Sequence, residues 1–176
     1  MSGYSRGVPA MGDVLRSVLV LGAIVLGVFF IGQLVTVTPD KPTADADWRT
    51  AASGVEQRAG YVPLVPDELP DGWRATRAAL DGDRWQLNVV TKDGDFIGLT
   101  QRPGDAKDLA ALVKDRAPET KPAGEADVAG TTWQLSIAGE ERTYARLVGR
   151  QAVVVTGTAP RGQFEDYIAS LEPFSS

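Results

Sequence analysis

The stretch GDRWQLNVV, residues Gly82–Val90, decides the fold, and GTTWQLSIA, residues Gly130–Ala138, repeats its pattern further along the chain. In each copy Trp, Leu and a β-branched residue alternate with Gln, a second polar residue and a further apolar one. This period of two is typical of a half-buried strand. Glycine turns border both copies, so we expect each copy to form one strand of an antiparallel hairpin.

The segments that follow the two copies predict two similar halves, about residues 73–116 and 126–171. In the first half, a turn at residues 92–95 precedes a strand over 96–101 and an amphipathic helix over 105–116. In the second half, strands over 142–148 and 151–156 precede a helix over 161–171. Each half therefore ends in a helix, and we interpret the proline-containing residues 117–124 as the linker between the halves.

The two tryptophans of the repeat, Trp85 and Trp133, are predicted to lie in the core between the sheet and these helices. We expect both helices to cover the same face of the sheet, because each follows its strands in the same way. A platform on which a ligand stacks is the alternative role for the two rings. The neighbouring Leu87 and Leu135 favour the core.

The composition excludes several kinds of site. The formal net charge is −5, which argues against a nucleic-acid partner, because binding a polyanion needs clustered basic residues. The chain has no cysteine and no histidine, so disulfides, zinc sites built on these residues, cysteine nucleophiles and Ser–His triads cannot form. Beyond residue 47 no serine stands in a Ser-x-x-Lys or Gly-x-Ser-x-Gly motif. We therefore expect no enzyme and no bound cofactor.

Two acidic stretches, Asp81-Gly82-Asp83 and Asp93-Gly94-Asp95, offer carboxylates that calcium prefers. Neither stretch adds the further acidic positions and the bidentate Glu of a strong calcium loop. Asp-Gly is also the ordinary composition of a hairpin turn. We interpret both stretches as turns and expect no metal site.

A membrane anchor is predicted near the start of the chain. Residues 17–35 carry no charge and, at about 1.5 Å per residue, are long enough to span a bilayer as a helix. Basic residues precede this segment and mostly acidic ones follow it. The positive-inside rule therefore predicts a cytoplasmic tail over 1–16 and an outward-facing domain over 47–174 at the plasma membrane. A signal peptide cleaved near Ala46 stays open as the alternative.

Between the anchor and the sheet we expect an extended tether over 36–46 and a lightly packed helix that Asp47 caps and Gly60 ends. Prolines then exclude a helix and disfavour an inner strand. We expect this proline-rich segment, residues 61–73, to cross the surface and to turn at residues 70–72. It is our candidate interaction surface, with Tyr61, Pro63, Pro66, Leu69, Pro70 and Trp73.

Short motifs carry a family resemblance: LPDGW at residues 69–73, GTTW at 130–133 and VTGTA at 155–159, behind a membrane helix. In this order the chain resembles the actinobacterial family known as domain of unknown function 4245, over most of residues 14–173. The resemblance implies a membrane-anchored extracytoplasmic protein of unassigned activity, and it transfers no functional residue. A looser similarity is to PsbP-like domains, which are antiparallel sheets flanked by helices that mostly serve binding or assembly.

These observations predict an α+β domain with a mostly antiparallel sheet of about seven strands and three outer helices. Its predicted function is that of a binding or assembly module of the cell envelope, with an envelope protein or a lipid as partner. A lipid or small-ligand domain is the alternative, and it would need an apolar pocket between sheet and helices, behind Trp85 and Trp133. A metalloenzyme with oxygen ligands would need three or more carboxylates brought together from distant segments.

Overall fold

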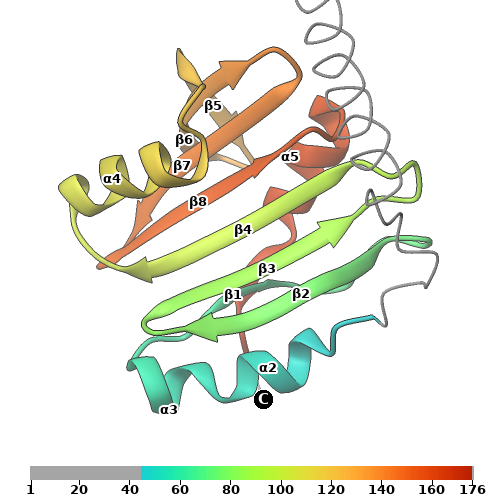
Figure 1. Ribbon diagram of the computed structural model, residues 1–176, viewed down its shortest axis with the longest axis vertical. Coiled ribbons are helices and arrows are strands. Elements are labelled where there is room, and N and C mark those ends of the chain that lie inside the picture. Colours follow the sequence, from blue (N-terminus) through green and yellow to red (C-terminus); the bar gives the residue numbers. More distant parts are fainter. Residues whose placement is uncertain (1–44, 176) are drawn as a thin grey trace, which may run out of the picture. The chain divides into compact units, whose positions relative to one another are not determined.

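The computed structural model describes residues 45–175, which form an α+β domain on a seven-stranded antiparallel sheet (Figure 1). The predicted fold class is confirmed in this part of the chain. The predicted cytoplasmic tail (1–16), membrane helix (17–35) and most of the tether (36–46) lie outside the described residues. Within residues 45–175 no helix is long and apolar enough to cross a membrane.

Helices and strands follow one another in three groups. The first group holds α2 (Trp48–Ser53), α3 (Val55–Ala59) and β1 (Leu64–Pro66). The second group holds β2 (Arg74–Asp81), β3 (Arg84–Val90), β4 (Phe96–Pro103) and α4 (Ala106–Arg116). The third group holds β5 (Lys121–Val128), β6 (Thr131–Ala138), β7 (Glu141–Val148), β8 (Gln151–Gly157), α5 (Arg161–Ala169) and β9 (Leu171–Pro173).

The strand order in the large sheet is β2-β3-β4-β8-β7-β6-β5, while β1 and β9 form a separate two-stranded ladder. The two copies of the repeat, on β3 and β6, are each next to an edge strand, so the prediction of equivalent hairpin strands is confirmed. Trp85 is fully buried and Trp133 is 4% exposed, and both belong to the main core. Both rings therefore serve the core, as predicted.

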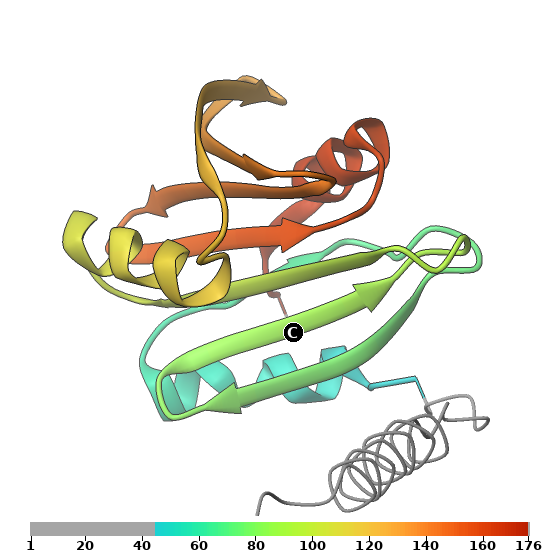
Figure 2. The ribbon, with the colours of Figure 1, turned by 45° about the horizontal axis from the view of Figure 1, so that its top comes forward.

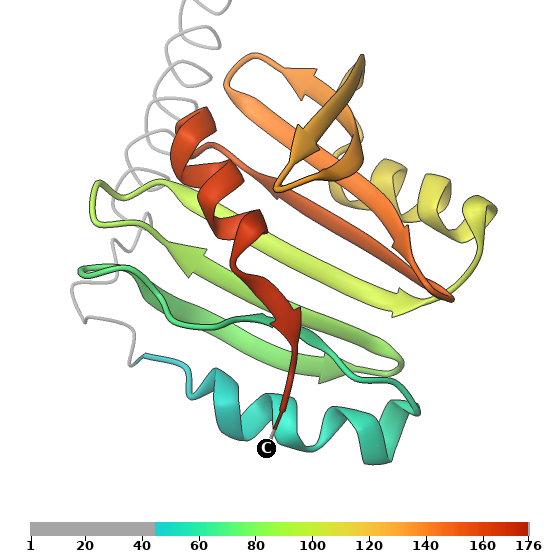
Figure 3. The same ribbon diagram turned by 180° about the vertical axis from the view of Figure 1, so that it is seen from behind.

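The two long helices lie on opposite faces of the sheet, so the expectation of a shared face was wrong (Figures 1 and 3). Val153 and Val155 belong to the core that includes Phe164 of α5. Val154, between them, packs instead with Leu112 of α4. Neighbouring residues of a strand point to opposite faces, and the apolar stripe of a helix does not show which face it will meet. Figure 2 shows α4 along its own side of the sheet.

The predicted linker over 117–124 was wrong in its second half, because β5 begins at Lys121. Pro122 is accepted there because β5 is an edge strand, where a missing amide donor need not break a ladder. The pairing of β5 with β6 is shifted between Pro122 and Gly124. Gly124 takes a φ of 104°, which a residue with a side chain rarely adopts.

The first helical segment is confirmed with two changes. The Asp47 side chain accepts from the Thr50 amide at 3.0 Å, and Gly60 ends the segment with a φ of 72°. The helix is divided at Gly54 into α2 and α3. It packs tightly rather than lightly, because Trp48 and Val55 are buried in the main core.

The last helix is shorter than predicted. It ends at Ala169, and Leu171 begins β9 instead of completing the helical stripe. The backbone amide of Ser170 donates to Asp166 and Tyr167 and so closes the last turn. The chain then pairs with β1, from Leu64 opposite Pro173 to Pro66 opposite Leu171. This small ladder lies over the face of the sheet that α5 covers (Figure 3).

Candidate binding site

The proline-rich segment is buried in its first half, residues 61–66, so its predicted exposure was wrong there, whereas most of residues 67–72 are exposed and include the predicted turn. Tyr61, Pro63 and Pro66 are buried, because β1 lies against the main core. Leu69 and Trp73 are half-buried and pack against the same core, with the Trp73 ring stacked at 6.3 Å on Tyr167. Pro70 is the exposed member of the six. Their role in an interaction stays a prediction, but five of the six side chains contribute to the fold.

Tyr61 shows why the segment is held inside. Its hydroxyl accepts from the Trp85 amide at 3.1 Å and shares its one proton between the carbonyl oxygens of Asp83 and Gln101, each at 3.0 Å. Trp85 and Gln101 are opposite each other on β3 and β4, so the hydroxyl bridges the two strands. Burial raises the pKa of Tyr61 to about 12. The group is therefore a neutral structural bridge at physiological pH.

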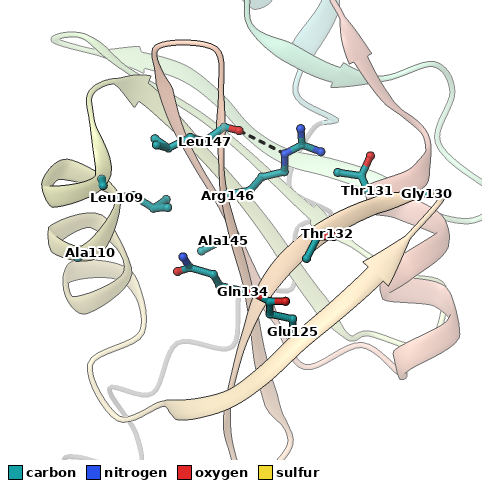
Figure 4. Close-up of a pocket in the computed structure, with 11 residues that line it drawn as sticks. Leu109, Ala110, Glu125, Gly130, Thr131, Thr132, Gln134, Ala145, Arg146 and Leu147 are labelled. Carbon is teal, nitrogen blue, oxygen red and sulfur yellow. Dashed lines mark hydrogen bonds between the residues drawn. The ribbon is translucent and has the colours of Figure 1, made fainter.

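The large sheet has a gap between β6 and β7. Their ladder runs from Ala138 opposite Glu141 to Gln134 opposite Ala145, and it stops there. β6 continues to Thr131 in its pairing with β5, and β7 continues to Val148 in its pairing with β8. The residues 131–133 and 146–148 thus face each other without a ladder, and Figure 4 shows the two strands diverging there. We call this gap the seam.

The direction of the backbone groups at the seam follows from the hairpins on either side. Val148 and Gln151 close the hairpin of β7 and β8, and the closing pair of such a two-residue hairpin is hydrogen-bonded. Bonding alternates along an antiparallel strand, so the N–H and C=O of the preceding Leu147 point away from β8 and into the seam. Val128 and Thr131 close the hairpin of β5 and β6 in the same way. The N–H and C=O of the following Thr132 therefore point away from β5 and into the seam.

A hollow of about 650 Å³ lies beside the seam on the face of the sheet that α4 covers (Figure 4). We call it the α4 hollow. Small or apolar residues of α4 form one wall, namely Ala106, Leu109 and Ala110. Strand residues, among them Thr132, Gln134, Ala145 and Leu147, line the rest, and Glu125 of β5 borders it. Leu147 is 37% exposed here, which is high for a large apolar side chain.

A second hollow, of about 290 Å³, lies near the seam on the α5 face and includes Trp133. We call it the Trp133 hollow. Apart from Thr131 and Arg146, its lining is apolar, and it includes Leu64, Val148, Ile168 and Leu171. Thr131 and Arg146 line both hollows. The seam is therefore bordered by a hollow on each face of the sheet. The lining of the α4 hollow is partly polar, and that of the Trp133 hollow is mainly apolar.

Arg146 is the cation of the seam. Its guanidinium carbon lies 5.3 Å from the centre of the Trp133 ring, and its Nε donates weakly to the Leu147 carbonyl oxygen at 3.5 Å. Figure 4 shows the guanidinium turned toward Thr131. None of the ion pairs within residues 45–175 involves Arg146. A partly exposed positive charge thus stands at the seam without a carboxylate from the described domain.

The acidic stretches form turns, as predicted. Gly82 and Gly94 take φ angles of 63° and 92° between the strands that they connect. In the described domain no three acidic residues come close enough together to hold a metal ion.

Comparisons with known proteins identify a family and distant likenesses to solved structures. No curated protein matches the chain. A crystal structure of MucB in complex with MucA(peri) is 18% identical and matches 65% of this chain and 38% of that one, with a TM-score of 0.40. A complex structure of Pseudomonas aeruginosa MucA/MucB is 17% identical and matches 66% and 36%, with a TM-score of 0.39. The chain thus spans less than two fifths of the length of these proteins.

The resemblance that the short motifs indicated is confirmed by a match over residues 6–171, which include all three motifs. The actinobacterial source and the looser similarity to PsbP-like domains stay predictions. Because the match extends over most of its length, the chain belongs to the family described as "protein of unknown function (DUF4245)".

Proposed function

We propose that this protein is a non-enzymatic, membrane-anchored binding or assembly module of the cell envelope, and that its outward-facing domain takes a polypeptide partner in the α4 hollow. The observation that carries the proposal is the seam. There Leu147 and Thr132 direct backbone donors and acceptors into a space that no strand of the described domain fills. A polypeptide offers both donors and acceptors in return.

The lining of the α4 hollow supports binding rather than catalysis. Its side chains are small, apolar, hydroxyl or amide groups, and its charged members are Glu125 and Arg146. General acid–base catalysis needs a titratable group with a shifted pKa near the reacting atoms, usually with a second group that positions it. The hollow has one carboxylate and no second acid that could share a proton with it.

The proposed location follows from the sequence. Residues 17–35 carry no charge. Arg6 and Arg16, against one acid at Asp13, precede them, and Asp40, Asp45 and Asp47, against one base at Lys41, follow. This asymmetry supports a single span with the N-terminus inside and the described domain outside the plasma membrane. A partner in this arrangement would be another protein of the envelope.

Site-specific photo-crosslinking of the full-length protein in native membranes tests the function. We would place benzoylphenylalanine at Ala110 or Gln134, which are exposed beside the α4 hollow, and at Arg77 on β2 as the matched control. We expect the same polypeptide adduct from both positions at the hollow and none from Arg77. Equal adducts from Arg77, or no adduct at the hollow, would contradict the proposal.

A small apolar ligand is the second candidate, and the Trp133 hollow favours it. The volume of about 290 Å³ and the mainly apolar lining would suit part of a lipid chain. The test is mass spectrometry of lipids extracted from the purified full-length protein, compared with Ala169→Trp, which places a large ring at this hollow. A stoichiometric lipid that the substitution removes would favour this function over the first.

A further inference from the structure

We infer that the partner presents an extended segment that enters the seam as an additional strand between β6 and β7, with an acidic side chain directed at Arg146. The inference rests on the proposed function and specifies how the partner is recognised.

The backbone carries the first step. Leu147 and Thr132 would be the next hydrogen-bonded pair of the ladder after Ala145 and Gln134, and the structure leaves them unpaired with each other. An extended segment between them can exchange hydrogen bonds with Leu147 on one side and with Thr132 on the other. The added strand would continue the sheet where β6 and β7 have separated.

The edges of the sheet are less suited to such pairing. The outer edge of β5 carries Pro122 and the shifted pairing next to Gly124, which interrupt an incoming ladder. At the opposite edge the carbonyl oxygen of Ala75 on β2 already accepts from the Ala46 amide at 2.8 Å, and α2 packs beside this strand. The seam combines backbone groups that no ladder pairs with space for side chains, which neither edge does.

The two hollows then specify the side chains. Successive residues of a strand point to opposite faces, so an inserted segment places alternate side chains in the α4 hollow and in the Trp133 hollow. The Trp133 hollow is lined by apolar residues such as Val148 and Ile168 and suits an aliphatic side chain. The α4 hollow, with Thr132 and Gln134, suits a small or polar one. The expected segment therefore alternates apolar with small or polar residues.

Charge fixes one further position. Arg146 stands at the seam without an ion pair in residues 45–175 and is already oriented on the Trp133 ring. A carboxylate of the segment would complete this site with a charge-assisted hydrogen bond. Glu125 borders the α4 hollow and would repel an acid placed there. The acidic residue therefore belongs at the Arg146 end of the segment.

Selection from a displayed library of random decapeptides against the full-length protein in lipid nanodiscs tests the inference. We expect enrichment of alternating sequences with one acidic residue. With a selected peptide as the probe, the backbone amides of Leu147 and Thr132 should become protected from hydrogen exchange. Arg146→Gln should weaken binding about tenfold, while replacing the peptide's acid by its amide should weaken binding to wild type and leave binding to Arg146→Gln unchanged.

Proline variants test the backbone pairing itself. Leu147→Pro removes an N–H that the ladder with β8 does not use, and Thr132→Pro does the same with respect to β5. Each should weaken binding about tenfold, whereas Leu147→Ala, which keeps the N–H, should change it less. Thermal unfolding shows whether either proline variant has lost its fold. If one has, the pairing is tested by the other proline variant and by hydrogen exchange of the wild-type protein with the peptide bound.

The outcomes separate the inference from the proposed function. The inference is overturned if the crosslinks appear but no such peptide is enriched. It is also overturned if peptides bind both proline variants with the affinity that they have for wild type. In either case the proposed binding module remains. If the crosslinks also fail, the proposed function is overturned with it.

Discussion

The indole nitrogen of Trp85 donates a hydrogen bond to the carbonyl oxygen of Leu64 at 3.1 Å, and this bond ties the repeated motif to the proline-rich segment. The amide of Leu64 donates in turn to the Gln101 side chain at 2.7 Å. Both backbone groups of Leu64 are thereby satisfied by side chains of the large sheet, which lets this short segment lie buried. The same segment would otherwise need water for these groups.

This bond predicts that the two tryptophans of the repeat differ in importance. Trp85→Phe keeps a ring but leaves the Leu64 carbonyl oxygen without its donor, so we expect the free energy of unfolding to fall by about 2–3 kcal/mol. Trp133→Phe is the matched control, where a weaker contact with Arg146 at 5.3 Å is reduced and a loss of about 1 kcal/mol is expected. Urea unfolding of both full-length variants in the same detergent measures the difference. Equal losses would contradict this role of Leu64.

Much of the fold could be predicted because it depends on local patterns. The alternation at residues 82–90 and 130–138, the glycine turns and the cap at Asp47 each act within a few residues, and each is found as expected. The face that α4 covers could not be predicted, because it depends on which strands become neighbours. The burial of Pro63 was missed for the same reason, since it depends on pairing with the far end of the chain.

Tyr61 predicts a loss of stability in alkali. Burial raises its pKa to about 12, whereas the unfolded chain releases the proton near the ordinary value of 10. The folded state therefore holds more protons than the unfolded state between these values, and the free energy of unfolding should fall as the pH rises from 10 to 12. Below pH 10 this contribution is fully present.

Tyr61→Phe isolates that contribution. The variant should be less stable at neutral pH, because the Trp85 amide loses its acceptor at 3.1 Å. Its stability should also fall less steeply through the alkaline range, with a remaining slope to which Tyr144 contributes, since burial raises that pKa to about 12 as well. Chemical unfolding at a series of pH values on both sides of 10 gives the two slopes. An unchanged slope in the variant would exclude Tyr61 as a source of the pH dependence.

Gly157, in the stretch VTGTA at residues 155–159, is predicted to be irreplaceable for steric reasons. A Cβ there would lie 2.1 Å from the Phe96 carbonyl oxygen and 3.0 Å from the Ile97 Cα, so β4 and β8 would have to separate. Gly157→Ala should lower the free energy of unfolding by more than about 3 kcal/mol. Gly162→Ala in α5 meets nothing within 4 Å and should raise it by about 0.5–1 kcal/mol. Thermal unfolding of the two variants measures their stabilities. A Gly157→Ala variant as stable as wild type would refute the steric argument.

The candidate site was less accessible to sequence reasoning than the fold. Residues such as Leu147 and Thr132 have the alternation of ordinary strand residues, and an unpaired strand residue has the same pattern as a paired one. The hairpin glycines do fix which backbone groups point toward which neighbour. They do not show that β6 and β7 separate, because the separation depends on the twist and packing of the whole sheet. The predicted exposure of Tyr61, Pro63 and Pro66 failed for a similar reason, because their burial depends on the packing of β1 against the main core.

The orientation in the membrane can be tested cleanly because the chain contains no cysteine, so a single introduced thiol reports its own position. Lys92→Cys places a thiol in the exposed turn before β4, and Ser5→Cys places one in the predicted cytoplasmic tail. A membrane-impermeant maleimide should label Lys92→Cys in intact cells and Ser5→Cys only after permeabilisation, because the positive-inside rule puts residues 1–16 in the cytoplasm. The reverse pattern would contradict the orientation.

The same pair distinguishes a retained anchor from a cleaved signal peptide. If the anchor is retained, the mass of the purified protein corresponds to the full chain, and Ser5→Cys is labelled after permeabilisation. Cleavage near Ala46 would instead remove the thiol of Ser5→Cys from the mature protein while Lys92→Cys stayed labelled in intact cells. In that case the described domain would be released from the membrane, and an anchored assembly role would no longer follow from residues 17–35, although the seam between β6 and β7 would remain available to a partner.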